Sequence, residues 1–421
     1  MEKAIYDNYL AILKSELIPA MGCTEPIAVA LAGAKSAQVL GGVPDKMDVY
    51  CSGNIVKNVK GVVVPNSGGQ RGIAVAAVLG AVGGDAEKGL EVIAGATDKD
   101  VELTRSLIQK GMCECHLEEG IENLYIRIEA VLADHNALVE VKTRHNHFSL
   151  IQRDGETLLK QDDIQVDGVK VDKGQLNLHD ILLFADEVSL DDIGDLVGTQ
   201  VKYNRGISEE GLKAPWGTQV GRTLLKEGNQ FSVRAAARAA AGSDARMGGC
   251  SLPVVINSGS GNQGIALTMP LVEYAEEHAV SEDKLFRALV IANLVSCHQK
   301  KYIGNLSAYC GATSAAAASA VGIAWLEGAS EKVISDTITN SIATIGGMVC
   351  DGAKSSCAAK IAAAVRTALL SYEMAASGCV FQPGEGLVGE DCEQTIQNIG
   401  RMGREGMKET DIEILNIMLG N

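Results

Sequence analysis

The chain has 421 residues, of which 46% are apolar and 21% are charged, and this balance excludes a mainly disordered protein. Its formal net charge of −16 disfavours nucleic acid and anionic membranes as partners, because both attract basic patches. The sequence contains 47 glycines and 11 cysteines, and its N-terminus lacks the basic start and apolar run of a signal peptide. We therefore expect a cytoplasmic protein whose thiols stay reduced.

The N-terminal part of the chain has the spacing of helices interrupted by one strand. Apolar residues at helical intervals predict a first helix over residues 2–17. A second helix is predicted to follow Cys23 and to end near residue 40, with Thr24 as its N-cap. A strand is expected over residues 47–51, and a helix rich in Ala, Val and Gly is expected to end near residue 84.

The pattern changes from about residue 98. Alternating apolar and polar residues predict half-buried strands over 113–117, 125–131, 137–143 and 147–152. We interpret residues 98–194 as a smaller α+β module inserted into a Gly/Ala-rich helical domain formed by residues 1–97 and 195–421. The predicted class is thus α+β and predominantly helical, with a discontinuous catalytic domain. Its second part is expected to hold helices near 231–242, 282–297, 312–326, 331–345 and 353–376.

Two stretches without charge, residues 247–272 and 302–326, are long enough to suggest membrane spans. The first contains two prolines and many glycines, and the second consists largely of Ala, Ser, Gly and Asn rather than Leu, Ile and Phe. This composition is typical of a closely packed interior. We therefore expect no association with a membrane.

One pattern occurs twice in the chain. Residues 62–74 read VVVPNSGGQRGIA, and residues 254–266 read VVINSGSGNQGIA. Each has an apolar run, then Asn-Ser-Gly, then a small polar loop and a Gly-Ile-Ala sequence that opens a predicted helix. Such a loop can present backbone N–H groups to an anion, so the two loops could converge on one carboxylate or phosphate. The alternative is that each loop is only a tight turn.

Cys23 lies between a glycine and a predicted helix N-terminus. The partial positive charge of a helix N-terminus stabilises a thiolate and lowers the pKa of the thiol, which predicts a base or a nucleophile. The alternative is a small buried apolar residue, which is a common role of a free cysteine.

Three cysteines of the C-terminal half could act together: Cys310 and Cys350 lie at predicted junctions of loops and helices, and Cys357 is predicted a turn or two into the next helix. Soft thiolates in a reducing compartment suit zinc or an iron–sulfur cluster. With spacing as the only evidence, scattered core cysteines are the better interpretation, because the chain has no Cys-x-x-Cys pair.

Taken together, the sequence MGCTEP at residues 21–26, the Asn-Ser-Gly loops and the spacing of the three cysteines resemble the L-cysteine desulfidase family. That family is related to the α part of bacterial iron–sulfur L-serine dehydratases, and the resemblance covers nearly the whole chain. It implies an oxygen-sensitive [4Fe–4S] cluster with one iron open to substrate. The residues implied as its ligands are Cys310, Cys350 and Cys357, and Cys23 is implied as the group that removes the Cα proton.

The activity implied by this resemblance is a β-elimination without pyridoxal phosphate, which converts L-cysteine to pyruvate, ammonia and hydrogen sulfide. An L-serine dehydratase with the same cluster is the first alternative, and a non-catalytic amino-acid sensor with structural or zinc-binding cysteines is the second. The expected partners are a small amino acid and further copies of the chain in a homo-oligomer. The residues expected to position the substrate carboxylate are Asn66, Ser67, Gly68, Gly69, Asn257, Ser258, Gly259, Ser260 and Gly261, with Arg71 as either a further carboxylate partner or a surface charge.

Overall fold

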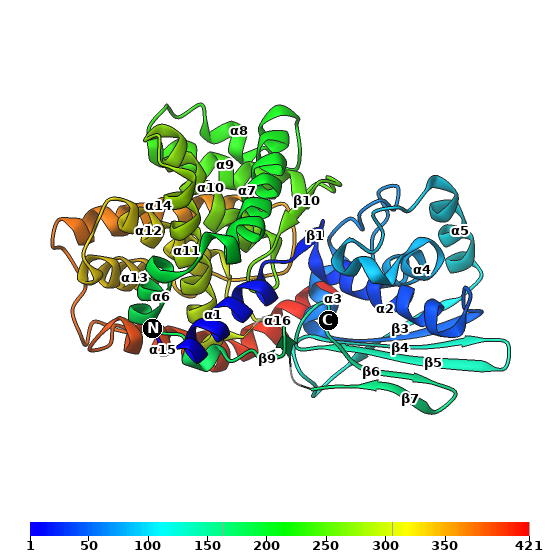
Figure 1. Cartoon of the computed structure of the whole chain (residues 1–421). Coiled ribbons are helices and arrows are strands. Elements are labelled where there is room, and N and C mark those ends of the chain that lie inside the picture. The colour runs from blue at the N-terminus through cyan, green and yellow to red at the C-terminus, as the bar shows by residue number, and fades with distance from the viewer. Residues whose placement is uncertain (163, 305, 421) are drawn as a thin grey trace.

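Helices predominate in the computed structural model, which describes residues 1–162, 164–304 and 306–420. Figure 1 shows a sheet covered by helices on one side of the molecule and a group of packed helices on the other. The predicted class, α+β and predominantly helical, is confirmed.

The main sheet has six strands in the order β3-β2-β4-β5-β6-β7. Only β2 and β3 are parallel, and the other neighbours pair antiparallel. The four strands predicted within residues 98–194 are confirmed. The strands are β2 (Lys46–Ser52), β3 (Cys113–Glu118), β4 (Tyr125–Leu132), β5 (His135–Lys142), β6 (Phe148–Arg153) and β7 (Glu156–Lys160).

The sheet does not coincide with the module predicted for residues 98–194. Strand β2 precedes that range and lies in the interior of the sheet, between β3 and β4. The sheet therefore draws strands from both sides of the proposed boundary, and the division of the chain into domains stays a prediction.

Two helices, α2 (Thr24–Leu40) and α4 (Ile73–Gly83), pack closely against each other near the sheet (Figure 1). Their backbones meet at two glycines. A Cβ atom on Gly33 would lie 2.2 Å from the Ala77 carbonyl oxygen, and one on Gly80 would lie 2.0 Å from that of Ala30. Larger side chains would separate these helices and shift the start of α2, where Cys23 lies.

The helices predicted for the C-terminal half are confirmed, although α9 and α11 extend beyond their predicted ends and α14 begins four residues later, at Cys357 rather than at residue 353. Alanine-rich α12 is buried along almost its whole length, which explains its lack of charge. Among the described residues, no helix combines the length and apolar character needed to cross a membrane. The helices on this side of the molecule are α6 (Leu178–Glu187), α7 (Leu190–Lys213), α8 (Val220–Leu224), α9 (Phe231–Met247), α10 (Gly261–Glu277), α11 (Glu282–Ile303), α12 (Ala312–Leu326), α13 (Glu331–Ile345), α14 (Cys357–Ala376) and α15 (Cys392–Arg401).

Two contacts join the sheet side of the molecule to the helical side. Strand β1 (Pro19–Met21) pairs antiparallel with β10 (Pro253–Val255), so the start of α2 lies beside the start of α10. The last helix, α16 (Lys408–Leu419), returns to pack on α3 (Gly53–Lys60), a helix that the sequence did not predict (Figure 1). The remaining elements are α1 (Lys3–Glu16), α5 (Asp98–Gln109), β8 (Gln165–Val166), β9 (Val169–Lys170), and the short turns of helix η1 (Ala86–Glu91), η2 (Lys173–Gln175) and η3 (Met402–Gly406).

Candidate functional site

A cavity of about 90 Å³ lies where the start of α2, the start of α10 and the end of α11 meet the loops that precede α12 and α14. Its lining includes four cysteines from separate parts of the chain, Cys23, Cys310, Cys350 and Cys357. A volume of this size holds several water-sized groups, since one water needs about 10–15 Å³ on this measure. The fold thus brings the predicted base and the three predicted ligands to one place.

The backbone fixes the loops that carry Cys310 and Cys350. The Cys310 N–H donates to the Met348 carbonyl over 2.9 Å, and the Cys350 N–H donates to the Ala308 carbonyl over 2.6 Å. These bonds place the two cysteines on adjacent extended segments. Cys357 is the first residue of α14, and all three are free thiols that are only partly exposed.

The spacing of the three sulfur atoms distinguishes between two kinds of metal site. Among the described residues, a single set of three possible ligand atoms from His, Cys, Asp or Glu has all its members within 4.8 Å of one another. That set is Asp48, Glu114 and His116, which lie on the sheet and away from the cavity. The three cysteine sulfurs therefore do not form such a set. A tetrahedral zinc ion would hold its thiolates about 3.8 Å apart, given a Zn–S bond of about 2.3 Å. The donor set fits a larger thiolate-bound group better, and a [4Fe–4S] cluster is one.

A buried cation stands beside these thiols. Lys300, near the end of α11, is 2% exposed and lines the same cavity. Burial lowers the pKa of Lys300 to about 8, while the charges of Cys350 and Cys310 act in the opposite direction. Burial raises the pKa of Cys310 to about 12, and the neighbouring Cys350 charge adds to this. Binding of a metal would therefore release protons from this group.

The environment of Cys23 differs from the sequence prediction. Cys23 is the N-cap residue of α2, and its buried thiol makes no capping hydrogen bond but donates to Glu25 Oε2 over 2.9 Å. Burial and the Glu25 charge raise the pKa of Cys23 well above its ordinary value, although Arg246 opposes them. The prediction of a lowered pKa was wrong, because the cost of burying a thiolate exceeds the benefit of the helix N-terminus. The predicted N-cap was also wrong, since the Thr24 hydroxyl donates instead to the Gly259 carbonyl over 2.9 Å.

Glu25 completes a short chain of proton-carrying groups that sequence reasoning missed. Its Oε1 lies 3.7 Å from Nε2 of the buried His145. Burial raises the pKa of Glu25, but His145, the Cys23 thiol and Arg246 outweigh it and lower that pKa to about 2. Glu25 is therefore a carboxylate at neutral pH, and the proton of the pair rests on the Cys23 sulfur. The sequence signal was the position of Glu25 two residues after Cys23.

The two Asn-Ser-Gly loops lie on either side of the Cys23 turn. In the first loop Pro65 packs against Gly22, because a Cβ on Gly22 would lie 2.2 Å from the Pro65 Cγ. In the second loop Gly259 accepts the Thr24 hydrogen bond. Of the nine predicted loop residues, Gly259 and Ser260 line the cavity, whereas Asn66, Ser67, Gly68, Gly69, Asn257, Ser258 and Gly261 do not.

The residues outside the cavity have local partners. Asn66 donates to the Ile93 carbonyl, and Asn257 donates to the Asn293 carbonyl and side chain. Arg71 is exposed on the surface, where it donates to the Gly61 carbonyl over 2.6 Å. This position fits the alternative interpretation of Arg71 as a surface charge.

Comparison with known proteins identifies the family of this chain. The family model of the serine dehydratase alpha chain matches residues 87–416. The chain belongs to this family. The matched range contains the second loop and all three clustered cysteines, and Cys23 lies before it.

Relatives similar to this chain also cover Cys23. A protein of Finegoldia magna is 46% identical over 98% of this chain and 99% of its own, and one of Treponema denticola is 43% identical over 100% and 99%. A third, of Lachnoclostridium phytofermentans, is 44% identical over 99% and 100%. All three are described as "UPF0597 protein".

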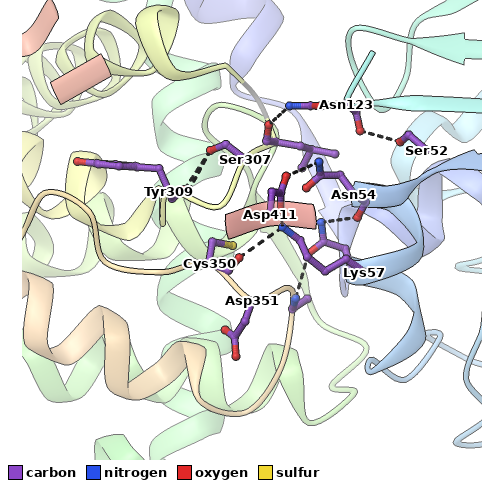
Figure 2. A network of polar contacts seen from close by, with 12 residues as sticks. Ser52, Asn54, Lys57, Asn123, Ser307, Tyr309, Cys350, Asp351 and Asp411 are labelled. Atoms are coloured by element: carbon purple, nitrogen blue, oxygen red, sulfur yellow. Dashed lines mark hydrogen bonds and ion pairs between the residues drawn. The ribbon is translucent and has the colours of Figure 1, made fainter. Parts of the chain in front are cut away.

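In this member of the serine dehydratase alpha chain family, a polar network supports the Cys350 loop (Figure 2). Lys57 of α3 has a side chain that is 1% exposed, forms an ion pair with Asp411 of α16 and reaches the Cys350 carbonyl over 3.4 Å. Asn54 donates to the same Asp411 carboxylate over 2.7 Å, and the Ala353 N–H donates to Asn58 Oδ1 over 3.1 Å. Helices α3 and α16 therefore hold the loop that carries one of the three thiols.

Proposed function

We propose that this protein is an iron–sulfur lyase that removes the β-substituent of a small L-amino acid, with L-cysteine as its substrate and pyruvate, ammonia and hydrogen sulfide as its products. Membership of the serine dehydratase alpha chain family supports a lyase of this general type. The preference for L-cysteine over L-serine is the finer part of the proposal and rests on the resemblance described above.

The observation that carries the proposal is the meeting of Cys23 with Cys310, Cys350 and Cys357 in one cavity. Three free thiols from two loops and a helix start fit the thiolate set of a [4Fe–4S] cluster, and the buried Lys300 offsets part of their negative charge. When bound, such a cluster supplies an open iron that acts as a Lewis acid towards the substrate.

The chain itself provides the proton-transfer groups. At rest the proton lies on the Cys23 sulfur, in a hydrogen bond to Glu25 Oε2. Cys23 can accept the Cα proton only as a thiolate, so we propose that its thiol first loses its own proton to solvent, while Glu25 holds the sulfur in place through their hydrogen bond and the two residues act as a pair. A thiolate with a raised pKa is a strong base, which suits the weakly acidic Cα–H bond. His145 stabilises the Glu25 carboxylate from the other side.

Pyruvate release from anaerobically reconstituted protein tests the proposal, with L-cysteine and L-serine supplied separately. We expect turnover of L-cysteine with release of sulfide. Turnover of L-serine alone would mean that the substrate is L-serine rather than L-cysteine. No turnover of either amino acid by fully loaded protein would refute the lyase.

Variants separate the roles of the cysteines. Cys23→Ala should retain iron and visible absorbance but lose turnover by about 100-fold or more, in the range of a lost general base. Cys357→Ala should lose the iron itself. Cys379→Ala is the matched control, because Cys379 is an exposed thiol outside the cavity.

A further inference from the structure

Arg246 is a buried cation close to Cys23 and Glu25. It lies at the end of α9, is 2% exposed and lines the cavity. Across the described ranges its guanidinium makes no hydrogen bond or ion pair, and its Nε is buried without a partner. An unpaired buried charge is costly, so a protein that retains one is expected to pair it with something that binds.

The fold leaves room for this guanidinium. A Cβ atom on Gly261, the first residue of α10, would lie 2.5 Å from Arg246 Nε and 3.0 Å from its Cζ. Gly261 is the last residue of the second Asn-Ser-Gly loop that the sequence singled out. In the structure, its lack of a side chain leaves space for Arg246.

Two side-chain amides beside Arg246 are also unpaired. Gln263 is 6% exposed, and both it and Asn262 line the cavity. The buried oxygens Gln263 Oε1 and Asn262 Oδ1 have no hydrogen-bond donor among the described residues. The first turn of α10 thus presents two acceptors to the same space into which the cation faces.

The guanidinium does not have to balance the charge of the three clustered thiols, because Lys300 already stands beside two of them. The Lys300 ammonium interacts electrostatically with Cys350 and Cys310. Arg246 interacts electrostatically with Cys23 and Glu25, and its interaction with Cys357 is weaker than that of Cys350 or Lys360. Arg246 therefore belongs to the wall of the cavity where proton transfer is proposed.

We propose that Arg246 binds the α-carboxylate of the substrate, and that Gln263 Oε1 and Asn262 Oδ1 accept hydrogen bonds from its α-ammonium group. This inference rests on the proposed function and names the substrate class, a zwitterionic α-amino acid with both groups free. The planar guanidinium can hold a carboxylate through two parallel hydrogen bonds. Arg246 thus has the carboxylate-binding role for which the sequence analysis considered Arg71.

Anaerobic calorimetry on the cluster-loaded protein tests this assignment with L-alanine, which lacks a leaving group and cannot be eliminated. We expect L-alanine to bind the wild type more tightly than L-alaninamide, in which the carboxylate is replaced by a neutral amide. Arg246→Gln should weaken L-alanine binding by about 10- to 100-fold, the range of a lost charge-assisted hydrogen bond, and should leave L-alaninamide binding almost unchanged. Arg246→Lys should lie between the two.

Arg366→Gln is the matched control, because Arg366 is exposed on α14 and pairs only with Glu227 in the described structure. Wild-type affinity for L-alanine in Arg246→Gln would overturn the inference. Loss of iron from that variant would also overturn it, since the guanidinium would then serve the thiolate-bound group. Arginine-dependent binding of L-alanine without release of pyruvate from L-cysteine or L-serine would support the inference and refute the lyase.

Discussion

The two Asn-Ser-Gly loops have similar sequences but different surroundings. In the first, residues 62–74, Gly68 and Gly69 are exposed and the side chains bond to nearby backbone. In the second, residues 254–266, Asn257 and Ser258 are almost completely buried, and Gly259 and Ser260 line the cavity. The first loop supports the Cys23 turn from outside, and the second forms part of the site.

The shared pattern therefore specifies a local turn, and the surroundings decide what the turn does. Both loops have short β-bridges, Val63 with Arg71 and Asn257 with Ser260, and both lead into a helix. The second lies beside buried charges from other segments, such as Glu16 of α1 and Arg246 of α9. Substitutions at corresponding positions should show this asymmetry.

The largest effect is expected at Glu16, which has no counterpart beside the first loop. Its carboxylate pairs with Arg144 over 2.9 Å and with Lys173 over 2.8 Å. Burial raises the pKa of Glu16, but Lys173, Arg144 and the Ser258 N–H outweigh it, so the net shift is downwards. Glu16→Gln should cost about 3–5 kcal/mol at pH 7, because it leaves two cations without their partner.

The pH dependence follows from the direction of that shift. A lowered folded-state pKa stabilises the protein above the ordinary glutamate pKa of about 4.3 and ceases to do so as the pH falls through the folded value. Urea unfolding from pH 7 down to about pH 2 should show the difference between wild type and Glu16→Gln staying constant above about pH 5 and shrinking below it. Asp167→Asn is the control, because its ion pair with Lys14 is exposed. A difference that grows in acid would contradict the assignment.

The next effect compares the glycines of the two Gly-Ile-Ala sequences, Gly264 in the first turn of α10 and Gly72 just before α4. A Cβ on Gly264 would lie 2.0 Å from the Val255 carbonyl oxygen, whereas a Cβ on Gly72 meets nothing within 4 Å. Gly264→Ala should destabilise by about 3 kcal/mol through overpacking against backbone. Gly72→Ala should cost about 1 kcal/mol, because the φ of +107° at Gly72 strains any other residue. Equal denaturation midpoints would show that the two helix starts are packed alike.

A smaller effect is expected at the two asparagines. Asn257→Asp keeps the shape of the side chain but places a carboxylate against the Asn293 oxygens in a fully buried position, which should cost about 2 kcal/mol. Asn66→Asp loses the bonds to the Ile93 and Ala94 carbonyls at a partly exposed site and should cost about 1 kcal/mol. Chemical denaturation measures both, and a larger loss at residue 66 would reverse the comparison.

Local patterns were enough to predict most of the elements. The helices α12 and α13 and the alternating strands β4 to β6 were predictable because their signals lie within one segment. Helix α3 was missed, since its eight residues mix Asn and Lys with Val. The place of β2 inside the sheet depends on pairing with strands more than sixty residues away, which no local pattern encodes.

The site was predictable only in part. The three clustered cysteines and Cys23 were nominated and lie together, whereas Arg246 was not singled out by any sequence pattern. Its isolation depends on Gly261 and on α10, which follow it in sequence. The pKa of Cys23 was misjudged for a similar reason, because burial by distant loops decides it.

The last comparison sets Gly259 against Gly68, and its effect is expected in turnover rather than in stability. Both have left-handed φ angles, +78° and +67°, so alanine strains both backbones by about the same 1–2 kcal/mol. A Cβ on Gly259 would lie 2.9 Å from Cε1 of His145, and one on Gly68 would lie 3.3 Å from Val101. Gly259→Ala must therefore displace His145, which neighbours Glu25.

If the Cys23–Glu25 pair transfers the proton, a shift of His145 should lower kcat/KM for pyruvate release by about 10-fold in Gly259→Ala, since catalytic rates fall steeply with small displacements. Gly68→Ala should keep the wild-type value within about twofold, because every contact that it alters lies outside the cavity. Iron content measured on both variants separates this effect from loss of the cluster. Equal kcat/KM in the two variants would mean that the second loop, like the first, only supports the Cys23 turn.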